Sequence, residues 1–269
     1  AAAGGLALLV GLLRSRCAEA AKEGAASALW ALSSTTGEKP THEANQVAIA
    51  EAGGIAPLVQ TLGLGAKAQE QAAGALASLA LGNSENEQSI AKLVVELLGH
   101  RSKQQAAKAA RAISRLARAH PSNQKSLAHA GGVSKLVSLL HTGEGGVGVG
   151  VQTGEAAVTA LVSAKVQMEM ASALWSMAQD NPDNQVAIAS AGGIPPLIAL
   201  LEGHPEVHRD VAGALWSLAA NTQNQVAIAE HGGIAPLVGL IQKGSTGAQE
   251  TAAGALFALA ETPTNRVLT

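Results

Sequence analysis

Two histidines stand at a spacing that metal sites use. His204 and His208, in the segment HPEVH, are four residues apart and could share one face of a helix, as paired metal ligands do. Glu206 is not placed as in the HExxH arrangement, and no third ligand is evident. Pro205 at the start of a helix explains the local pattern without a metal. We therefore predict no metal site and no cofactor.

The single cysteine, Cys17, ends the basic segment Arg14–Cys17, and nearby positive charge favours a thiolate. A catalytic cysteine also needs a base beside it, and the sequence identifies none. Because the chain has one Cys, an internal disulfide framework and a multi-cysteine zinc site are excluded. The sequence also lacks a nucleophile elbow and a P-loop. We expect a free thiol, no catalytic residues and no enzyme activity.

Positive charge gathers in one part of the chain. Between Leu97 and Gly143 there is no acidic residue, whereas eight Lys or Arg residues occur there. Four of them recur at helical spacing and so share one face of one helix. A stripe of this kind favours the binding of an acidic segment, a phosphopeptide or another polyanion. The alternative is a charged helix face that contacts only solvent. The stripe consists of Lys108, Arg111, Arg115 and Arg118.

The few aromatic residues are placed regularly. The chain of 269 residues has three Trp, one Phe and no Tyr, although 47% of it is hydrophobic. Four copies of one phrase carry them, from SALWALS at Trp30 to GALFALA at Phe257, with Trp175 and Trp216 between. Tryptophan offers a rigid apolar face and one N–H donor, which suits the aliphatic stems or basic side chains of a peptide. The alternative is that the rings fill the core between helices.

Charge and hydropathy exclude other classes of protein. Charged residues are 14% of the chain, with 18 basic and 20 acidic side chains, so we expect no general nucleic-acid binding and no acidic disordered tail. No run of 18 uncharged apolar residues is present, and we expect no membrane insertion. No secretory or transit signal is visible, so we expect a cytoplasmic location, with a nuclear or organellar one left open. The oligomeric state is not predicted.

The recurring phrases belong to a repeat of about 40 residues. NQVAIAEAGGIAPLV begins at Asn45, and close copies begin at Asn123, Asn184 and Asn224, with a shortened copy, NEQSIAKLVVELL, at Asn86. The steps between successive Asn residues are 41, 37, 61 and 40, so one unit contains a deletion and another an insertion. Because a single unit cannot bury its apolar face alone, the units must stack.

Each unit predicts three helices. We expect the repeated Asn to cap the first helix through its side chain, and a Gly-Gly pair such as Gly53-Gly54 to end it in left-handed backbone. The second helix, as at 55–62, tolerates Pro57 in its first turn. The third is longer, as at 69–81. Three positions before the aromatic stands a small residue that lets a neighbouring helix approach closely: Ser27, Gly74, Ser172, Gly213 and Gly254.

In combination, the period, the three helix lengths and the phrases GGI-x-PLV and ALW-SLA resemble the armadillo repeat family, closest in flavour to arrays of plant and algal proteins. The resemblance covers essentially the whole chain. It implies an all-α fold, a right-handed α-solenoid that forms a single domain over residues 1–269. The expected parts are a partial repeat at 1–37, repeats at 45–82, 86–118, 123–180, 184–220 and 224–261, and the start of a further repeat at 265–269.

Two features depart from a regular array. A Gly-rich insertion at about 141–154 lies in the longest unit, and residues 156–170 are expected to extend the helix that follows it. Neither end carries a polar capping unit, which solenoids normally need. We therefore expect a fragment of a longer array, or ends bounded by partners.

The resemblance also implies a concave groove, lined by the third helices, that binds an extended peptide or an unstructured segment of another protein. Six units about 8–10 Å apart give a groove of about 50–60 Å, which holds roughly 15 extended residues. Import adaptors of the family place an Asn four residues after the Trp, and none of the corresponding positions here is Asn. Nuclear import is therefore disfavoured. The expected anchor row is Trp30, Ala77, Ser114, Trp175, Trp216 and Phe257, and the basic stripe borders it at Ser114.

The sequence thus predicts a non-enzymatic protein-protein interaction scaffold. Its partner is a protein or an extended peptide, whose bound segment is acidic or phosphorylated. One alternative is a structural subunit of a large assembly, held by its loops and open ends, which the missing caps and the Gly-rich insertion favour. Another is a targeting module of a larger protein, such as a ubiquitin ligase.

Overall fold

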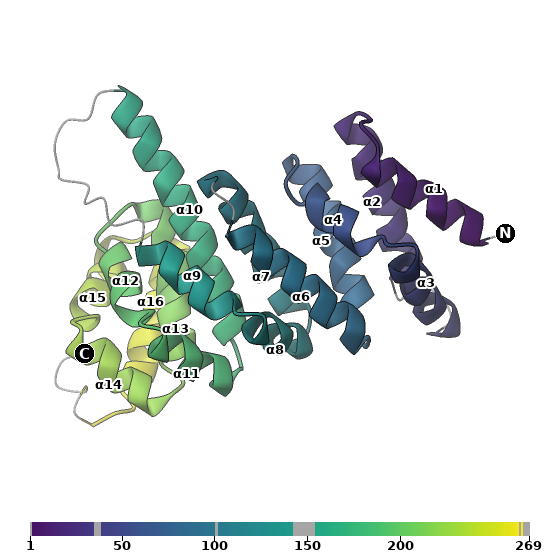
Figure 1. Cartoon of the computed structure of the whole chain (residues 1–269). Coiled ribbons are helices and arrows are strands. Elements are labelled where there is room, and N and C mark those ends of the chain that lie inside the picture. Colours follow the sequence, from purple (N-terminus) through teal and green to yellow (C-terminus); the bar gives the residue numbers. More distant parts are fainter. Residues whose placement is uncertain (1, 35–38, 100–101, 142–153, 264, 266–269) are drawn as a thin grey trace.

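A computed structural model describes residues 2–34, 39–99, 102–141, 154–263 and 265. Within these residues the regular elements are all helices, as the sequence predicted (Figure 1). No helix of the described chain is long and apolar enough to cross a bilayer. The Gly-rich insertion lies almost wholly outside the described residues.

The helices sort into three kinds, as the repeat requires. First helices are α3 (Lys39–Glu51), α8 (Pro121–His129), α11 (Pro182–Ser190) and α14 (Thr222–Glu230). Second helices are α1 (Ala2–Arg14), α4 (Ile55–Thr61), α9 (Gly132–His141), α12 (Ile194–Leu200) and α15 (Ile234–Lys243). Third helices are α2 (Glu19–Ser33), α5 (Ala66–Ala80), α7 (Lys103–Ala119), α10 (Gly154–Ala178), α13 (His208–Leu218) and α16 (Thr246–Leu259). A short 3₁₀ turn, η1 (Pro205–Val207), leads into α13.

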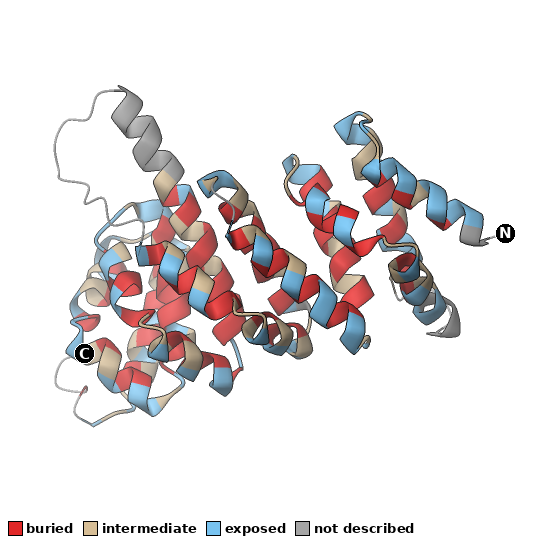
Figure 2. Ribbon diagram, in the orientation of Figure 1, coloured by how far each residue is buried: buried red, intermediate tan, exposed pale blue. Residues whose placement is uncertain are grey.

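Each third helix packs against the next, so α2, α5, α7, α10, α13 and α16 form one continuous layer. In Figure 1 this layer lies behind the second helices, and the first helices lie along the lower edge. Buried residues run through all the units between these layers (Figure 2). The core consists of Leu, Ile, Val and Ala with a few Met side chains, and its fully buried part contains no aromatic side chain among the described residues. The architecture is the predicted α-solenoid.

The Gly-Gly turns contain two glycines for two different reasons. Gly53 has φ +72°, the left-handed backbone that the sequence predicted for the end of the first helix. Gly54 is buried, and a Cβ there would lie 2.8 Å from Ile49 Cγ2. The turn therefore needs a positive φ at the first position and an absent side chain at the second. The same positive φ recurs at Gly131, Gly192 and Gly232.

One unit lacks this turn. The shortened phrase NEQSIAKLVVELL contains no Gly-Gly pair, and the chain there forms a single helix, α6 (Ser84–Leu98), in place of separate first and second helices. The 37-residue step thus reflects the loss of a turn. Conversely, α10 is 25 residues long, which confirms that residues 156–170 extend the third helix after the insertion.

The prediction that the repeated Asn caps its helix was wrong. The capping side chains are Asn83, Asn181 and Asn221, three residues earlier, and Asn181 Oδ1 accepts from the Asn184 backbone N–H at 3.1 Å. The helix begins one turn before the repeated phrase, which places Asn184 inside it. Asn184 is 3% exposed, so its side chain needs buried partners.

The hydrogen bonds to those partners link each unit to the unit that precedes it in the sequence. The Nδ2 of Asn184 donates to the Met177 carbonyl of α10 at 2.8 Å. The Nδ2 of Asn224 donates to Leu218 O at 3.1 Å and to Gln185 O, in the first helix of the preceding unit, at 3.2 Å. A hydrogen-bonded buried amide fixes its neighbours because a lost bond leaves a carbonyl unsatisfied. The repeated Asn therefore sets how successive units stack.

Candidate functional site

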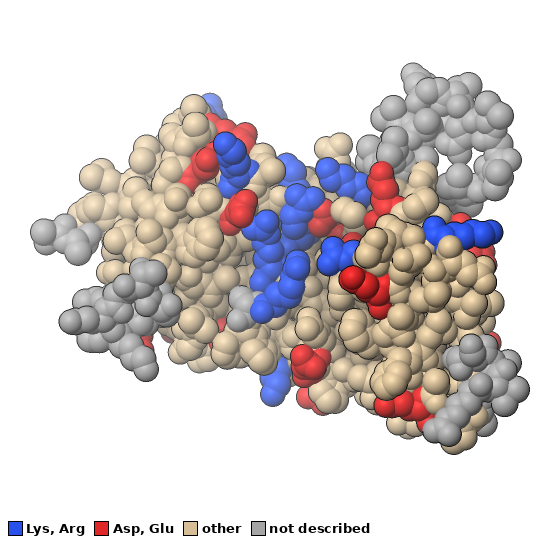
Figure 3. All heavy atoms as spheres, turned by 180° about the vertical axis from the view of Figure 1, so that it is seen from behind, with Lys and Arg blue, Asp and Glu red and all other residues tan. Residues whose placement is uncertain are grey.

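The third helices present one continuous face, seen from behind in Figure 3. The aromatic side chains of the expected anchor row lie on this layer, in α2, α10, α13 and α16. Trp30 is 36% exposed, Trp216 is 44% exposed and Phe257 is 75% exposed, whereas Trp175 is half-buried. The rings are thus available at the surface of the layer.

Each tryptophan ring lies against a glycine of the next third helix. A Cβ added at Gly213 of α13 would lie 2.6 Å from Cδ2 and Cε2 of the Trp175 ring of α10. The same distance holds for a Cβ at Gly254 against the Trp216 ring. The small residue three positions before the aromatic therefore makes room for the neighbouring unit's ring, rather than for a helix. Trp30 and Gly74 repeat the arrangement at the N-terminal end.

The middle of the layer breaks this pattern in a consistent way. Where Ala77 replaces the tryptophan, the next third helix carries Arg111 in place of the glycine. Where Ser114 replaces it, the next helix carries Ser172. Without a ring to accommodate, the following position is free to be larger or polar. The aromatic row is therefore interrupted by a polar section centred on α7.

A cleft of about 570 Å³ separates the two adjacent tryptophans Trp175 and Trp216. The guanidinium of Arg209 lies 5.8 Å from the centroid of the Trp175 ring, within cation–π range. The cleft thus combines aromatic faces with amide, hydroxyl and carboxylate groups able to hold a peptide backbone. Its remaining lining residues are Gln179, Asp180, Pro182, Gln185, Ser217, Ala220 and Asn221.

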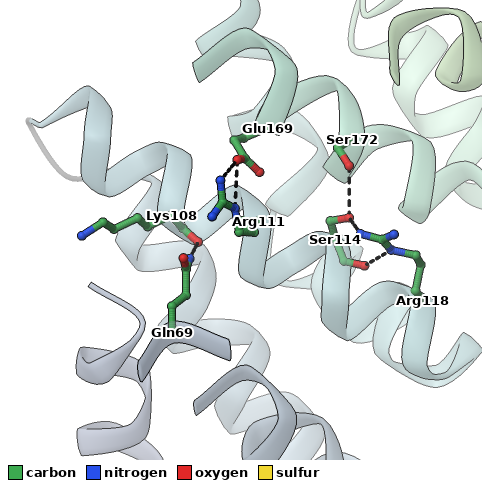
Figure 4. A network of polar contacts seen from close by, with 7 residues as sticks. All are labelled: Gln69, Lys108, Arg111, Ser114, Arg118, Glu169 and Ser172. Atoms are coloured by element: carbon green, nitrogen blue, oxygen red, sulfur yellow. Dashed lines mark hydrogen bonds and ion pairs between the residues drawn. The ribbon is translucent and has the colours of Figure 1, made fainter. Parts of the chain in front are cut away.

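The residues of the basic stripe all lie on α7, but their charges differ in availability. The guanidinium of Arg111 donates through Nε and Nη2 to one carboxylate oxygen of Glu169 in α10, with Nε at 2.9 Å (Figure 4). Glu169 is 6% exposed. The hydrogen bond to Glu169 raises the pKa of Arg111, against the effect of burial, so the guanidinium stays protonated. The charge of Arg111 is therefore compensated within the chain.

Lys108 and Arg115 are less compensated. Among the described residues, the Lys108 ammonium donates to a backbone oxygen, that of Gly63, and Gln69 Nε2 donates to the Lys108 carbonyl at 2.9 Å. Arg115 Nη1 lies 3.9 Å from Glu70 Oε1, and such an exposed pair contributes little to stability. In Figure 3 the Lys and Arg side chains form a band across the middle of the third-helix face.

Ser114 is buried and bonds to the exposed Arg118 on the same helix. Ser114 is 1% exposed, and its Oγ lies 2.8 Å from Ser176 Oγ and 3.4 Å from Ser172 Oγ. Arg118 Nη2 donates to the same hydroxyl at 2.6 Å, and its Nε donates to Ser114 O at 3.2 Å (Figure 4). Ser114, expected in the ligand-binding row, therefore positions Arg118 and offers no surface of its own.

The sequence analysis missed two residues that complete the polar section. Lys165 and Glu169, four residues apart on α10, face α7 across a cleft of about 410 Å³. Their Lys-x-x-x-Glu spacing places them on one helix face, and this spacing is the sequence pattern from which they could have been identified. They were missed because their position beside α7 depends on where α10 runs after the insertion.

Asp210, near the start of α13, carries a perturbed carboxyl beside this cluster. Burial raises its pKa above the ordinary value of 3.8, although Arg209, Arg118 and a hydrogen bond from Ser172 act in the opposite direction. The folded state therefore favours the protonated carboxyl, and stability falls as pH rises from the unfolded pKa through the raised folded pKa.

We expect Asp210→Asn to leave the protein equally or more stable at pH 7, because an amide carries no charge to desolvate. The gain should shrink as the pH falls through the ordinary value of 3.8, because the parental carboxyl then becomes increasingly protonated in both states. Urea unfolding at pH 7 and pH 3.5 measures both values. A loss of stability at pH 7 would mean that the pairing of Asp210 with the arginines outweighs burial.

The residues considered for metal or thiol chemistry lie apart from this face. The described residues contain no group of three or more His, Cys, Asp or Glu placed to hold a metal ion. Burial lowers the pKa of His208, while a backbone hydrogen bond to Gly203 raises it. Cys17 is half-buried, and its Sγ lies 3.4 Å from Leu12 O.

Comparison with known proteins agrees with the repeat architecture. The family model described as Armadillo/beta-catenin-like repeat matches residues 181–220 and 221–260. Two engineered proteins of solved structure are similar, one with 29% identity, a TM-score of 0.65 and coverage of 96% of this chain and 97% of that one. The other has 27% identity, a TM-score of 0.66 and coverage of 96% and 99%.

A designed armadillo repeat protein in complex with the peptide (KR)4 has the same fold, with 24% identity, a TM-score of 0.63 and coverage of 94% of this chain and 99% of that one. The comparison with curated proteins gave no match. The likeness to plant and algal arrays stays a prediction. The two matched repeats identify residues 181–260 as armadillo repeats. The three-helix unit recurs through the described residues, whose fold is that of the solved armadillo repeat solenoids.

Proposed function

We propose that the chain is a non-enzymatic scaffold whose third-helix face binds an extended segment of a partner protein. The cleft between Trp175 and Trp216 carries the proposal. An exposed Trp216 and a half-buried Trp175 flank this polar-lined cleft. Such an arrangement is typical of binding sites, because rigid rings bury much apolar area at low entropic cost. Amide side chains such as Gln179 and Asn221 can pair with the backbone of an extended peptide.

The segment bound here is acidic on the side that faces α7. The designed relative is in complex with the basic peptide (KR)4. The third-helix face of this chain instead carries a band of Lys and Arg across its middle (Figure 3). Like charges on a ligand and its site disfavour binding, so this face selects against a uniformly basic segment.

The test compares the parent with Trp216→Ala against a phage-displayed library of random 16-residue peptides. We expect the parent to enrich peptides with acidic residues, and Trp216→Ala to weaken binding of the enriched peptides at least tenfold, as for a buried aromatic anchor. Fluorescence anisotropy with the purified peptides measures the Kd values.

Val186→Ala/Val226→Ala is the matched control, because it removes exposed apolar side chains from two consecutive first helices outside the tryptophan cleft. Circular dichroism checks that every variant keeps its helices. If Trp216→Ala binds as tightly as the parent, the groove proposal fails. Contact through loops and ends, as in a structural subunit, would then be the better explanation, and the targeting-module alternative would remain to be tested in the full-length protein.

A further inference from the structure

The second cleft of the third-helix face lies where α5, α7 and α10 meet. It has a volume of about 410 Å³ and is open to the surface between these helices. Lys108 and Arg111 reach it from α7, and Lys165 and Glu169 reach it from α10. Its remaining lining residues are Leu64, Gly65, Ala66, Gln69, Gln104, Ala107 and Val166.

The charges around this cleft do not cancel. Three cations and one carboxylate line it, and Arg111 and Glu169 neutralise each other through their ion pair. That leaves the two lysines. Among the described side chains, no carboxylate lies within ion-pair distance of Lys108 or Lys165.

One further carboxylate lies near the edge of this cleft. Glu19 of α2 accepts a hydrogen bond from the Gly65 backbone N–H at 2.6 Å. It approaches from α2, whereas the two lysines come from α7 and α10 on the other side of α5. The Glu19 carboxylate is therefore bonded at the start of α5, and it forms no ion pair with either lysine among the described contacts.

The two ammonium groups have N–H donors that the described contacts do not use. An ammonium has three N–H donors, and the described contacts of Lys108 use one of them, on the Gly63 oxygen. That bond, together with the partial burial of the side chain, holds Lys108 at the cleft wall. Lys165 is exposed at the opposite wall and can reach an incoming group.

We propose that this cleft binds a phosphate monoester, a phosphoserine or phosphothreonine of the segment that the third-helix face holds. This rests on the proposed function and names the chemistry of one position of that segment. Two lysines on separate helices are better suited to bind a dianion than to bind a single carboxylate. A phosphate monoester carries nearly two negative charges and three acceptor oxygens. The Arg111–Glu169 pair links α7 to α10 beside the two lysines.

The test uses three bead-bound degenerate peptide libraries, identical except for a fixed central phosphoserine, glutamate or serine. The full chain is applied at physiological salt, and retention is measured for the parent and for Lys108→Gln/Lys165→Gln. We expect the parent to be retained at least about tenfold more strongly on the phosphoserine library than on the serine library. The lysine variant should lose this preference, because each charge-assisted contact is worth about tenfold or more in affinity.

The matched control is Lys92→Gln/Lys125→Gln, which removes the same charge from exposed positions on α6 and α8. It should keep the phosphoserine preference. Equal retention on the phosphoserine and serine libraries, or the same preference in parent and lysine variant, would overturn the proposal. Preference for glutamate over phosphoserine would also overturn it, in favour of a plainly acidic segment.

The Trp216→Ala variant separates this proposal from the proposed function. If the serine library is retained by the parent and lost in Trp216→Ala, while phosphorylation has no effect, the groove binds segments and the phosphate site is wrong. If the parent retains no library, both proposals fail. Inorganic phosphate added as a competitor should reduce retention of the phosphoserine library alone.

Discussion

Gly213→Ala is expected to destabilise the protein by about 2 kcal/mol, although alanine is the better helix former. The added Cβ would lie 2.6 Å from two atoms of the Trp175 ring, so the ring or α13 must shift, and overpacking of this kind costs about 1–3 kcal/mol. Equilibrium unfolding in urea, followed by circular dichroism, measures the change.

A double-mutant cycle isolates the cause. In a Trp175→Ala background the ring is absent, and Gly213→Ala should then stabilise the helix by up to about 1 kcal/mol. The sign of the effect therefore reverses. Gly239→Ala in α15 is the control, because no atom lies within 4 Å of its added Cβ. If Gly213→Ala destabilises equally in both backgrounds, the contact between ring and glycine is not the reason.

Asn184→Leu is the second large effect, with an expected loss of about 3 kcal/mol. Its buried Nδ2 donates to Met177 O at 2.8 Å and lies 3.5 Å from Gln124 O of the preceding unit. Leucine has a similar size but leaves a buried carbonyl without a donor, which costs about 1–3 kcal/mol in addition to the lost bond. Urea unfolding measures the change.

Asn221→Ala provides the comparison for this prediction. Asn221 caps α14 by accepting from the Gln223 and Asn224 backbone N–H groups, and loss of a cap costs about 1 kcal/mol. Loss of a hydrogen bond that links two units should therefore destabilise the protein more than loss of a helix cap. A loss at Asn184 no greater than the loss at Asn221 would contradict the role assigned to the repeated Asn.

Local signals predicted the helices and turns well. A Gly-Gly pair ends a helix through its own backbone freedom, so Gly53 and Gly192 could be interpreted from neighbouring residues alone. The role of Asn184 could not, because a capping Asn and a buried Asn look alike until the start of the helix is known. That start depends on Asn181, one turn earlier.

In the candidate site too, some features could be predicted from local spacing and others depend on how the helices pack. Helical spacing was enough to place Lys108, Arg111 and Arg118 on one face of α7. It could not show that Arg111 is paired with Glu169, a residue 58 positions away in the sequence, or that Arg118 bonds to a buried Ser114. The availability of the Arg111 charge is therefore decided by the neighbouring helix α10, which supplies Glu169.

The sequence by itself determined the repeat, its three helices and the positions of the aromatic residues, because each depends on periodicity and on short-range backbone preferences. Only the tertiary structure decided which side chains meet across units. Trp175 packs against Gly213, and Lys108 and Lys165 line one cleft, because stacking brings residues from different units together. Those contacts depend on where each third helix runs relative to the next, and no pattern within one unit specifies that.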